Sequence, residues 1–445
     1  MSRASRRRAT ILGPVRIEDL DDRGRGVARV DGRMIFIEGA LTGERVRYRP
    51  RRRGRRADVG ETVEVLEASP RRVVPACPHY ASCGGCRMQH AEHALQLDWK
   101  ERELLRALAA QGDLRPAELL APIAGPLGGY RRRARLGARL VPGKGGVLVG
   151  FREKFSNKVA ALERCAVLDG RVGDSIGELA RLLDRLAARD RVAQLEVSVA
   201  DGALAVVLRH LVPLGEDDRA RLVDFARARG WQLYLQPGGP DTIHPLWPQA
   251  PASLTYALPE FGVELAFAPT DFVQVNAEVN RRLVAHAVDA LAPGPDARVL
   301  DLYCGIGNFS LALARRARHV TGIESNAAMV ERARGNAERN RIDNVAFQAA
   351  DLDADPRGTP WWSAPWDGVL LDPPRSGAAT VLGALAAPYP RRIVYVSCNP
   401  QTLAADGELL TRDKGYTLSA AGVVDMFPHT AHCEAMAVFD AGARR

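Results

Sequence analysis

Short apolar runs recur through the second half of the chain, and several of them end at or just before a polar residue. Residues 298–302, 320–323, 345–348, 366–371 and 392–396 are such runs. Near-continuous apolar runs of this length are typical of parallel strands that are buried on both faces. In an open α/β sheet the ligand lies at the carboxyl ends of the strands. The sequence therefore predicts an open α/β sheet whose binding residues directly follow these runs.

The turn after the first run, residues 303–308, contains Gly305 and Gly307 and leads into a helical run at 309–314. Glycines in such a turn let the backbone approach a ligand closely. The turn lacks the full dinucleotide-binding fingerprint, because a bulkier residue occupies the third glycine position. Two glycines alone leave the identity of the ligand open.

Acidic residues stand at the ends of the next strands. Glu324 ends the second run, Asp351 follows the third, and Asp372 closes the fourth. A single carboxylate at a strand end is more often a helix N-cap than a ligand contact. Several in register are hard to explain as caps, and Glu324 and Asp351 would suit a ribose diol and an adenine amino group. We therefore expect a cationic ligand with an adenosine moiety, which points to S-adenosylmethionine.

Cys398 follows the last apolar run, in the sequence Ser397-Cys398-Asn399-Pro400. A lone cysteine is often a buried structural residue, and for Cys398 alone that alternative is about as good as a substrate-facing thiol. Two other cysteines compete with it. Cys304 lies in the glycine turn, where a small side chain suits packing, and Cys433 precedes Glu434 on a predicted strand, so the two side chains should point to opposite faces.

Four further cysteines form a separate group, namely Cys77, Cys83, Cys86 and the distant Cys165. Disulfides are one explanation, but cytosolic clusters of this kind are more often metal sites. The spacing leaves zinc and an iron-sulfur cluster equally open, because both accept four thiolates. Backbone N–H groups of Gly84 and Gly85 could bond cluster sulfurs, which slightly favours iron.

Positive charge is concentrated at the start of the chain. Residues 1–72 hold 19 arginines and 11 acidic residues, a net charge of +8 out of +9 for the whole chain. About five short strands with glycine turns predict a small OB-like barrel here. We expect Arg49, Arg51, Arg52, Arg53, Arg55 and Arg56 to lie in one loop and to contact RNA phosphates. No apolar run is long enough to span a membrane, so we expect a cytoplasmic protein.

Five motifs of the second half resemble the S-adenosylmethionine-dependent RNA uracil-5-methyltransferases. In order they are Asp271-Phe272-Val273-Gln274-Val275-Asn276, residues 300–309, Leu371-Asp372-Pro373-Pro374-Arg375, residues 396–400, and residues 425–434. The N-terminal segment is similar to a TRAM domain, an RNA-binding module. The resemblance implies a Rossmann-like class I methyltransferase sheet, preceded by the barrel and by a central α/β iron-sulfur domain. We expect domains at residues 1–70, 71–265 and 266–445.

The resemblance also assigns roles. Cys398 is implied as the nucleophile that adds to uracil C6, and Glu434 as the base that removes the C5 proton. The implied S-adenosylmethionine contacts are Gln274, Tyr303, Asn308, Glu324, Asp351 and Asp372. The group of four cysteines resembles the [4Fe-4S] ligands of family members that carry a cluster. The implied ligands are Cys77, Cys83, Cys86 and Cys165.

By the resemblance, barrel and cluster together favour 23S rRNA as the substrate, since members resembling the tRNA T-loop methylase lack both. Methylation of another rRNA or tRNA uridine is the nearest alternative. A non-catalytic iron-sulfur RNA-binding protein would leave Cys398 and Glu434 unexplained. A radical methylthiotransferase requires a C-x3-C-x2-C triplet, whereas the first spacing here is C-x5-C, and an adenine N6-methyltransferase carries an aromatic residue where Arg375 stands. Nothing in the sequence fixes the oligomeric state, and we expect a monomer.

Overall fold

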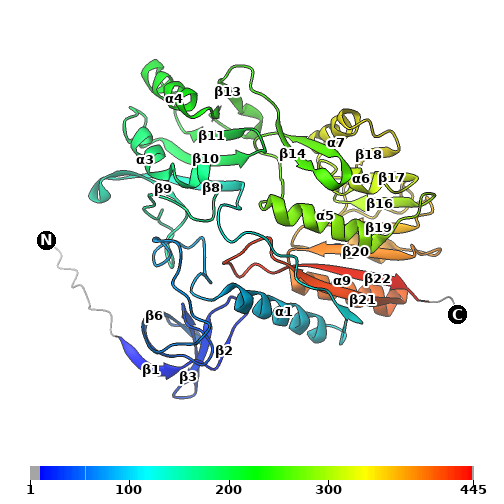
Figure 1. The fold of residues 1–445 in the computed structure, drawn as a ribbon, viewed down its shortest axis with the longest axis horizontal. Helices are drawn as coiled ribbons and strands as arrows, with labels where there is room; N and C mark the ends of the chain where they lie inside the picture. Colours follow the sequence, from blue (N-terminus) through cyan, green and yellow to red (C-terminus); the bar gives the residue numbers. More distant parts are fainter. Residues whose placement is uncertain (1–10, 56, 443–445) are drawn as a thin grey trace. The chain divides into compact units, whose positions relative to one another are not determined.

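The computed structural model describes residues 11–55 and 57–442, which form two compact units (Figure 1). The first unit comprises the described residues up to 100 together with 151–160 and 428–431, and the second unit comprises 101–150, 161–427 and 432–442. Each unit is thus assembled from separate stretches of chain. The three predicted domain ranges remain predictions.

The N-terminal sheet of the first unit has six strands in the order β1-β5-β6-β4-β3-β2. Alternate side chains point inward and form a core of their own around Ile17, Ile37 and Val46. A second small core joins Leu20 to Met88 and Trp99. The strands are β1 Leu12–Arg16, β2 Asp19–Leu20, β3 Gly26–Val30, β4 Arg33–Glu38, β5 Arg45–Arg52 and β6 Ala57–Glu67.

The predicted arginine loop is wrong in part. Arg49, Arg51 and Arg52 belong to strand β5, because that strand continues its pairing with β6, and only Arg53 and Arg55 follow it. Arginines are accommodated there since their side chains stand on the solvent face opposite acidic neighbours; Arg47, for example, pairs with Glu64 at 3.2 Å. Arg56 lies outside the described residues.

The large sheet of the second unit has the order β18-β17-β16-β19-β20-β22-β21-β7. The first five strands are parallel to one another. Strand β22 runs antiparallel to both of its neighbours, β20 and β21, and β7 pairs with β21 in parallel. The strands are β7 Glu118–Leu119, β16 Arg298–Leu302, β17 His319–Glu324, β18 Val345–Ala349, β19 Gly368–Leu371, β20 Arg392–Ser397, β21 Tyr416–Val424 and β22 Glu434–Ala441. The five predicted apolar strands are confirmed.

Helices cover both faces of this sheet. Val299 packs into one core and its neighbour Leu300 into the other, because successive side chains of a strand point to opposite faces. The first core includes α5 Ala277–Leu291, α6 Ser310–Ala314 and α7 Ala327–Arg339, and the second includes α8 Ala379–Ala384, α9 Pro400–Glu408 and the later turns of α1 His93–Ala110. A π-helical turn, Leu409–Asp413, follows α9.

The second unit also contains a six-stranded sheet of order β13-β12-β11-β10-β8-β9 and the hairpin β14-β15. Strands β10 and β11 form an antiparallel hairpin whose turn contains Asp201 and Gly202. The strands are β8 Arg133–Val141, β9 Gly146–Gly150, β10 Val192–Val199, β11 Leu204–His210, β12 Gln232–Gln236, β13 His244–Trp247, β14 Leu254–Leu258 and β15 Val263–Phe267. The helices are α2 Gly170–Gly173, α3 Ile176–Asp184 and α4 Glu216–Arg229, and single 3-10 turns occupy Pro142–Lys144, Pro240–Thr242 and Pro259–Phe261.

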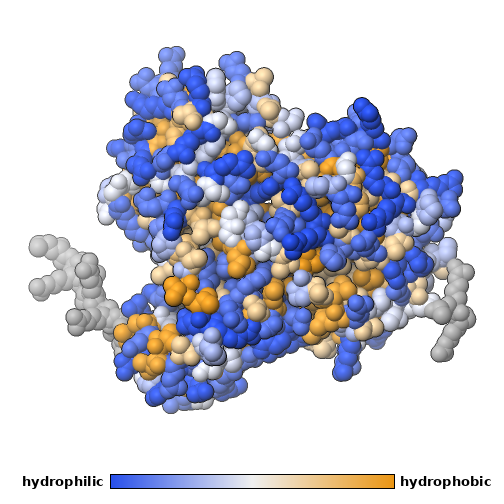
Figure 2. Space-filling model, in the orientation of Figure 1, coloured by the Kyte–Doolittle hydropathy of each residue, from blue (hydrophilic) through white to orange (hydrophobic). Residues whose placement is uncertain are grey.

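Hydrophilic residues cover most of the face seen in Figure 2, with smaller hydrophobic patches between them. Among the large apolar side chains that stay exposed are Val74, Phe272 and Phe155. Within the described ranges no helix combines the length and the apolar character needed to cross a membrane.

Candidate active site

Several predicted site residues stand at the carboxyl ends of the parallel strands of the large sheet, namely Tyr303, Glu324, Asp372 and Cys398. Leu302 of β16 lies beside Leu371 of β19, so Tyr303 and Asp372 follow two neighbouring strands. The strand order reverses between β16 and β19. The strands that follow β16 in the sequence, β17 and β18, lie on one side of this pair, and β20, which follows β19, lies on the other. A sheet of this kind has its crevice at such a point.

Cys398 and Glu434 are brought together by the pairing of β20 with β22. These strands are antiparallel, and Ser397 lies opposite Ala435. Cys398 directly follows Ser397 at the end of β20, and Glu434 directly precedes Ala435 at the start of β22. The two residues therefore lie at the same end of this strand pair, close enough for the charge of Glu434 to act on the thiol. Glu434 is buried, and Cys398 is half-buried.

The surroundings of Cys398 act on its ionisation in two directions. Burial raises the pKa of the thiol, and the carboxylates of Glu434 and Asp372 raise that pKa further. Arg375 lowers the pKa of Cys398 through its positive charge and, to a smaller extent, through a side-chain hydrogen bond. The four residues therefore form one electrostatic group with a protonated thiol at rest.

Arg375 is held from several sides. Its guanidinium donates to Nδ1 of His432 at 2.8 Å, and its backbone carbonyl accepts from the amide of Asn399 at 3.1 Å. Asn399 also caps helix α9, so the loop that carries Arg375 is tied to the residue next to Cys398. The role of Arg375 beside the thiol was missed in the sequence. Its position directly after Asp-Pro-Pro was the available signal.

The turn after β16 has the tight geometry that its glycines suggested. Gly305 and Gly307 have positive φ, and so does Tyr303, at 62°. A tyrosine in this region is strained, and such residues cluster at functional sites. Glu324 holds the turn, because its carboxylate accepts from the backbone N–H of Gly305 at 3.2 Å and from that of Asn326 at 2.8 Å.

Two carboxylates flank this turn, the buried Asp301 and the half-buried Asp372. Burial raises the pKa of Asp301 to about 7, and Asp372 and Glu324 contribute to that increase, whereas a hydrogen bond from Ser310 opposes it. Oδ1 of Asp301 is buried with no hydrogen-bond partner among the described residues. Burial also raises the pKa of Asp372 to about 7, against the effect of a hydrogen bond from Gln274 at 3.2 Å. Asp301 lies in the second family motif, residues 300–309, but it is not among the predicted site residues. An acid inside an apolar strand is nevertheless a recognisable signal.

The other predicted cofactor contacts are arranged differently. The side chain of Asn308 exchanges two hydrogen bonds of 3.0 Å with Asn280 and accepts a third from Tyr256 at 2.9 Å. Asp351 is exposed, and its carboxylate accepts from the backbone N–H of Asp353 at 2.9 Å. The roles of the six predicted cofactor residues remain predictions.

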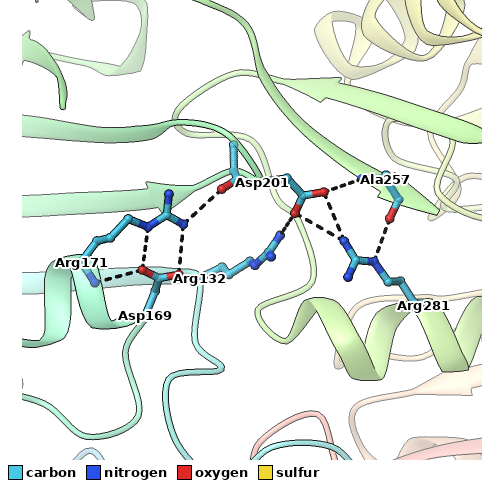
Figure 3. A network of polar contacts seen from close by, with 7 residues as sticks. Arg132, Asp169, Arg171, Asp201, Ala257 and Arg281 are labelled. Atoms are coloured by element: carbon cyan, nitrogen blue, oxygen red, sulfur yellow. Dashed lines mark hydrogen bonds and ion pairs between the residues drawn. The ribbon is translucent and has the colours of Figure 1, made fainter. Parts of the chain in front are cut away.

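A network of ionic and hydrogen-bonded contacts joins Arg132, Asp201 and Arg281 (Figure 3). Asp201 accepts from Arg132, from Arg281 of α5 and from the backbone N–H of Ala257. Arg281 in turn donates to the carbonyl of Ala257 at 2.9 Å. Because the backbone N–H of Arg132 also bonds the carbonyl of Val275, at 2.8 Å, the network fixes the residue next to Gln274.

The two competing cysteines of the second unit are packed in cores. Cys304 is 4% exposed and Cys433 is 7% exposed, and each belongs to one of the two cores that sandwich the large sheet. Burial raises the pKa of Cys304 well above its ordinary value. Among the three cysteines in this half of the chain, Cys398 is the one with partial access to solvent.

The four N-terminal cysteines are divided between the units, with Cys77, Cys83 and Cys86 in the first and Cys165 in the second. Cys83 and Cys86 are buried, and the backbone N–H of Gly85 lies 3.4 Å from Sγ of Cys83. Both thiols lie near Lys154, whose pKa is lowered by burial but raised by nearby Glu38, Glu61, Cys83 and Cys86. Across the described ranges no group of three or more His, Cys, Asp or Glu side chains is placed to hold a metal ion.

Comparison with known proteins gives full-length matches. Residues 263–354 and 363–441 match the family model described as tRNA (Uracil-5-)-methyltransferase, and residues 13–48 match the TRAM domain. The chain is 50% identical over 444 residues to "23S rRNA (uracil(1939)-C(5))-methyltransferase RlmD" of Alkalilimnicola ehrlichii, covering 100% of both chains. It is 48% identical over 429 residues to the protein of the same name from Alcanivorax borkumensis, covering 96% of each.

A solved structure agrees with these matches. The Pyrococcus abyssi tRNA (uracil-54, C5)-methyltransferase in complex with S-adenosyl-L-homocysteine is 26% identical, with a TM-score of 0.75 over 96% of this chain and 98% of that one. The expected methyltransferase sheet and TRAM domain are thereby confirmed.

The electrostatic group around Cys398 predicts opposite effects of two substitutions on thiol ionisation. Glu434→Gln removes a negative neighbour and should lower the pKa of Cys398, whereas Arg375→Ala removes its cationic partner and should raise that pKa. The rate of iodoacetamide alkylation of the Cys398 peptide, followed by mass spectrometry across pH, measures both. Arg412→Ala, on the exposed turn after α9, serves as the control. Shifts of the same sign in both variants would contradict this description of the site.

Proposed function

The chain belongs to the RlmD family of 23S rRNA (uracil-C5)-methyltransferases, and on that premise we propose that it methylates C5 of uracil 1939 in 23S rRNA. The uracil position is the one in the printed names of relatives that are 48–50% identical over essentially the whole chain. The TRAM domain and the basic N-terminal segment support an RNA substrate. A substrate of this kind is met in the cytoplasm, where we propose that the enzyme acts.

The observation that carries the mechanism is the proximity of Cys398 and Glu434, which flank the last pair of β20 and β22, Ser397 with Ala435. C5 of uracil is a weak nucleophile, and addition of the Cys398 thiolate to C6 raises the electron density at C5. S-adenosylmethionine supplies the methyl group that C5 then acquires. Glu434 takes the C5 proton, and the electron pair of that C–H bond restores the C5–C6 double bond as Sγ leaves C6.

Arg375 would assist the first step. The thiol must lose its proton before it adds to C6, and burial beside two carboxylates opposes that loss. The guanidinium that hydrogen-bonds Sγ stabilises the thiolate relative to the thiol. Glu434, which disfavours the thiolate while it is ionised, is needed as a base only after the methyl group has been transferred.

The charge of the strand-end crevice fits S-adenosylmethionine, which is cationic. Asp372 and Glu324 repel the ionised form of Asp301, and burial raises the pKa of Asp301 and of Asp372 to about 7. A bound cation would stabilise the ionised forms of Asp301 and Asp372. We propose that Glu324 accepts from the ribose hydroxyls, and that Gln274, Tyr303, Asn308, Asp351 and Asp372 complete the predicted contact set.

Methylation of a tRNA uridine is the second candidate, because the Pyrococcus abyssi structure is that of a tRNA (uracil-54, C5)-methyltransferase. Identity to that protein is 26%, against 50% to the 23S rRNA enzyme of Alkalilimnicola ehrlichii. The higher identity favours the rRNA substrate.

Incubation of the protein with S-adenosylmethionine and unmodified 23S rRNA should produce one methyl group at uracil 1939, mapped by nuclease digestion and mass spectrometry.

Cys398→Ala should abolish methylation and keep the affinity for S-adenosylmethionine measured by calorimetry, since the thiol acts on uracil. Glu324→Ala should weaken that affinity by about 1–3 kcal/mol, the value for a hydrogen bond to a charged group. Methylation of tRNA but not of 23S rRNA would replace this proposal with the second candidate.

We further propose that Cys77, Cys83, Cys86 and Cys165 hold a [4Fe-4S] cluster. Four thiolates are the donor set that such clusters require, and the Gly85 N–H beside Sγ of Cys83 is of the kind that bonds cluster sulfurs. The burial of Cys83 and Cys86 also fits a ligand role more than a surface one. No step of the methyl transfer involves this group, and its proposed role is structural.

Protein purified without oxygen should be brown and contain about four iron and four sulfide per chain. Cys83→Ser should remove the colour and lower the thermal midpoint, because a cluster joining distant residues stabilises the fold. Cys433→Ser, at a buried cysteine outside the proposed ligand set, should keep both iron and sulfide. Stoichiometric zinc without iron would refute the cluster. Retention of iron in both variants would refute it as well.

A further inference from the structure

The first unit contains a basic cavity of about 670 Å³, which we call the arginine pocket. Strand β5 contributes Arg51 and Arg52, the cysteine segment contributes Gly84 and Gly85, and residues 151–157 complete the wall. We propose that the arginine pocket binds one unstacked nucleotide of the RNA substrate, with its phosphate on the arginines and its base on Phe155. The inference rests on the proposed function only in taking RNA as the substrate.

The pocket is built by a short hairpin that docks on the cysteine segment. Residues 151–160 fold back on themselves, since Arg152 bridges to Val159 and the N–H of Ala160 bonds the carbonyl of Phe151 at 2.8 Å. This hairpin meets the cysteine segment through a bond of 2.8 Å from the N–H of Gly84 to the carbonyl of Arg152. A Cβ at Gly84 would lie 3.0 Å from that carbonyl, so glycine permits the close approach. The wall of the pocket is therefore backbone-bonded and well defined.

Positive charge in the pocket exceeds what its own acids neutralise. Seven basic residues and two acidic ones line it. Arg87 pairs with Glu38 at 2.8 Å, and Arg51 pairs with Glu61. Arg52 and Arg152 have no carboxylate partner among the described residues. Two such guanidinium groups at one cavity are suited to a phosphate, which they can bind through two parallel hydrogen bonds each.

Phe155 has two properties that a packing residue would not need. It is 44% exposed at the wall of the pocket, and its φ is +55°, in the left-handed region that bulky side chains rarely adopt. Backbone strain of this kind is found where function requires a particular side-chain position. The guanidinium of Arg51 lies 5.4 Å from the centre of the ring. An exposed ring next to arginines is the arrangement on which single-stranded nucleic acids stack their bases.

These features favour a single-stranded nucleotide over other polyanions. In duplex RNA the bases are stacked within the helix and cannot reach an isolated ring, whereas loops and bulges can present an unstacked base. An acidic protein surface would use the arginines but would leave the position of Phe155 unexplained. Duplex and acidic partners are therefore outcomes that the test must separate.

The test measures binding of an in-vitro 23S rRNA transcript to the full chain by filter binding over a range of salt. Phe155→Ala should raise Kd about 5- to 150-fold, the range for one lost base stack, and Phe155→Tyr should restore most of the affinity. Arg152→Ala should reduce the slope of log K against log salt by about 0.7, the contribution of one phosphate contact on a single strand. At saturating RNA the methylation kcat of these variants should equal that of the wild type, with KM increased.

Arg47→Ala is the matched control, because Arg47 lies on the same strand as Arg51 but outside the pocket and is paired with Glu64. It should change Kd less than either pocket variant. Unchanged Kd in Phe155→Ala, an equal loss in Arg47→Ala, or equally good competition by a duplex RNA or by polyglutamate would overturn the inference. The wild-type methylation assay reports on the proposed function separately, so a wild type that binds RNA through Phe155 without methylating 23S rRNA would refute that function and leave the pocket standing.

Discussion

The antiparallel pairing of β22 with β20 is the constraint on which the active site depends. Ligands of an open α/β sheet lie where the parallel strands end, and an antiparallel strand inserted beside them begins at that same edge. Cys398 therefore follows the last residue of β20, and Glu434 is the first residue of β22. Two residues that are 36 positions apart in the sequence thus come together at the end of a single strand pair. This strand pair brings together the proposed nucleophile and the proposed base.

Burial determines how these groups ionise. Burial and the nearby charges of Glu434 and Asp372 make the Cys398 thiolate costly, and burial together with Asp372 and Glu324 makes the Asp301 carboxylate costly. Arg375 is the cation placed against this excess, and it is fixed through His432 and Asn399. Binding a cationic methyl donor would relieve the remaining repulsion. The same charge that disfavours the resting thiolate therefore favours the cofactor.

Much of this arrangement is local in sequence and could be predicted. The apolar runs predicted the five parallel strands β16 to β20 of the large sheet. The motif resemblance gave the family. Arg375 and Asp301 were missed as site residues because their importance comes from neighbours on other strands. The sequence predicts a loop for the arginine-rich segment, whereas strand β5 extends through Arg52. The strand extends this far because β6 pairs with it and places acidic residues opposite the arginines, and composition does not reveal that pairing. The hairpin 151–160 belongs to the first unit through backbone bonds to the cysteine segment, which no local pattern indicates.

The central claim is that Cys398 and Glu434 act in sequence on one uracil, and a denaturing gel tests it most directly. Glu434→Gln should still add to C6 and accept the methyl group at C5 but fail to remove the C5 proton, so a covalent protein–RNA band should accumulate with S-adenosylmethionine present. The band should be absent when Cys398→Ala is added to the same chain. Inactive Glu434→Gln protein without such a band, or a band that persists without Cys398, would contradict the account.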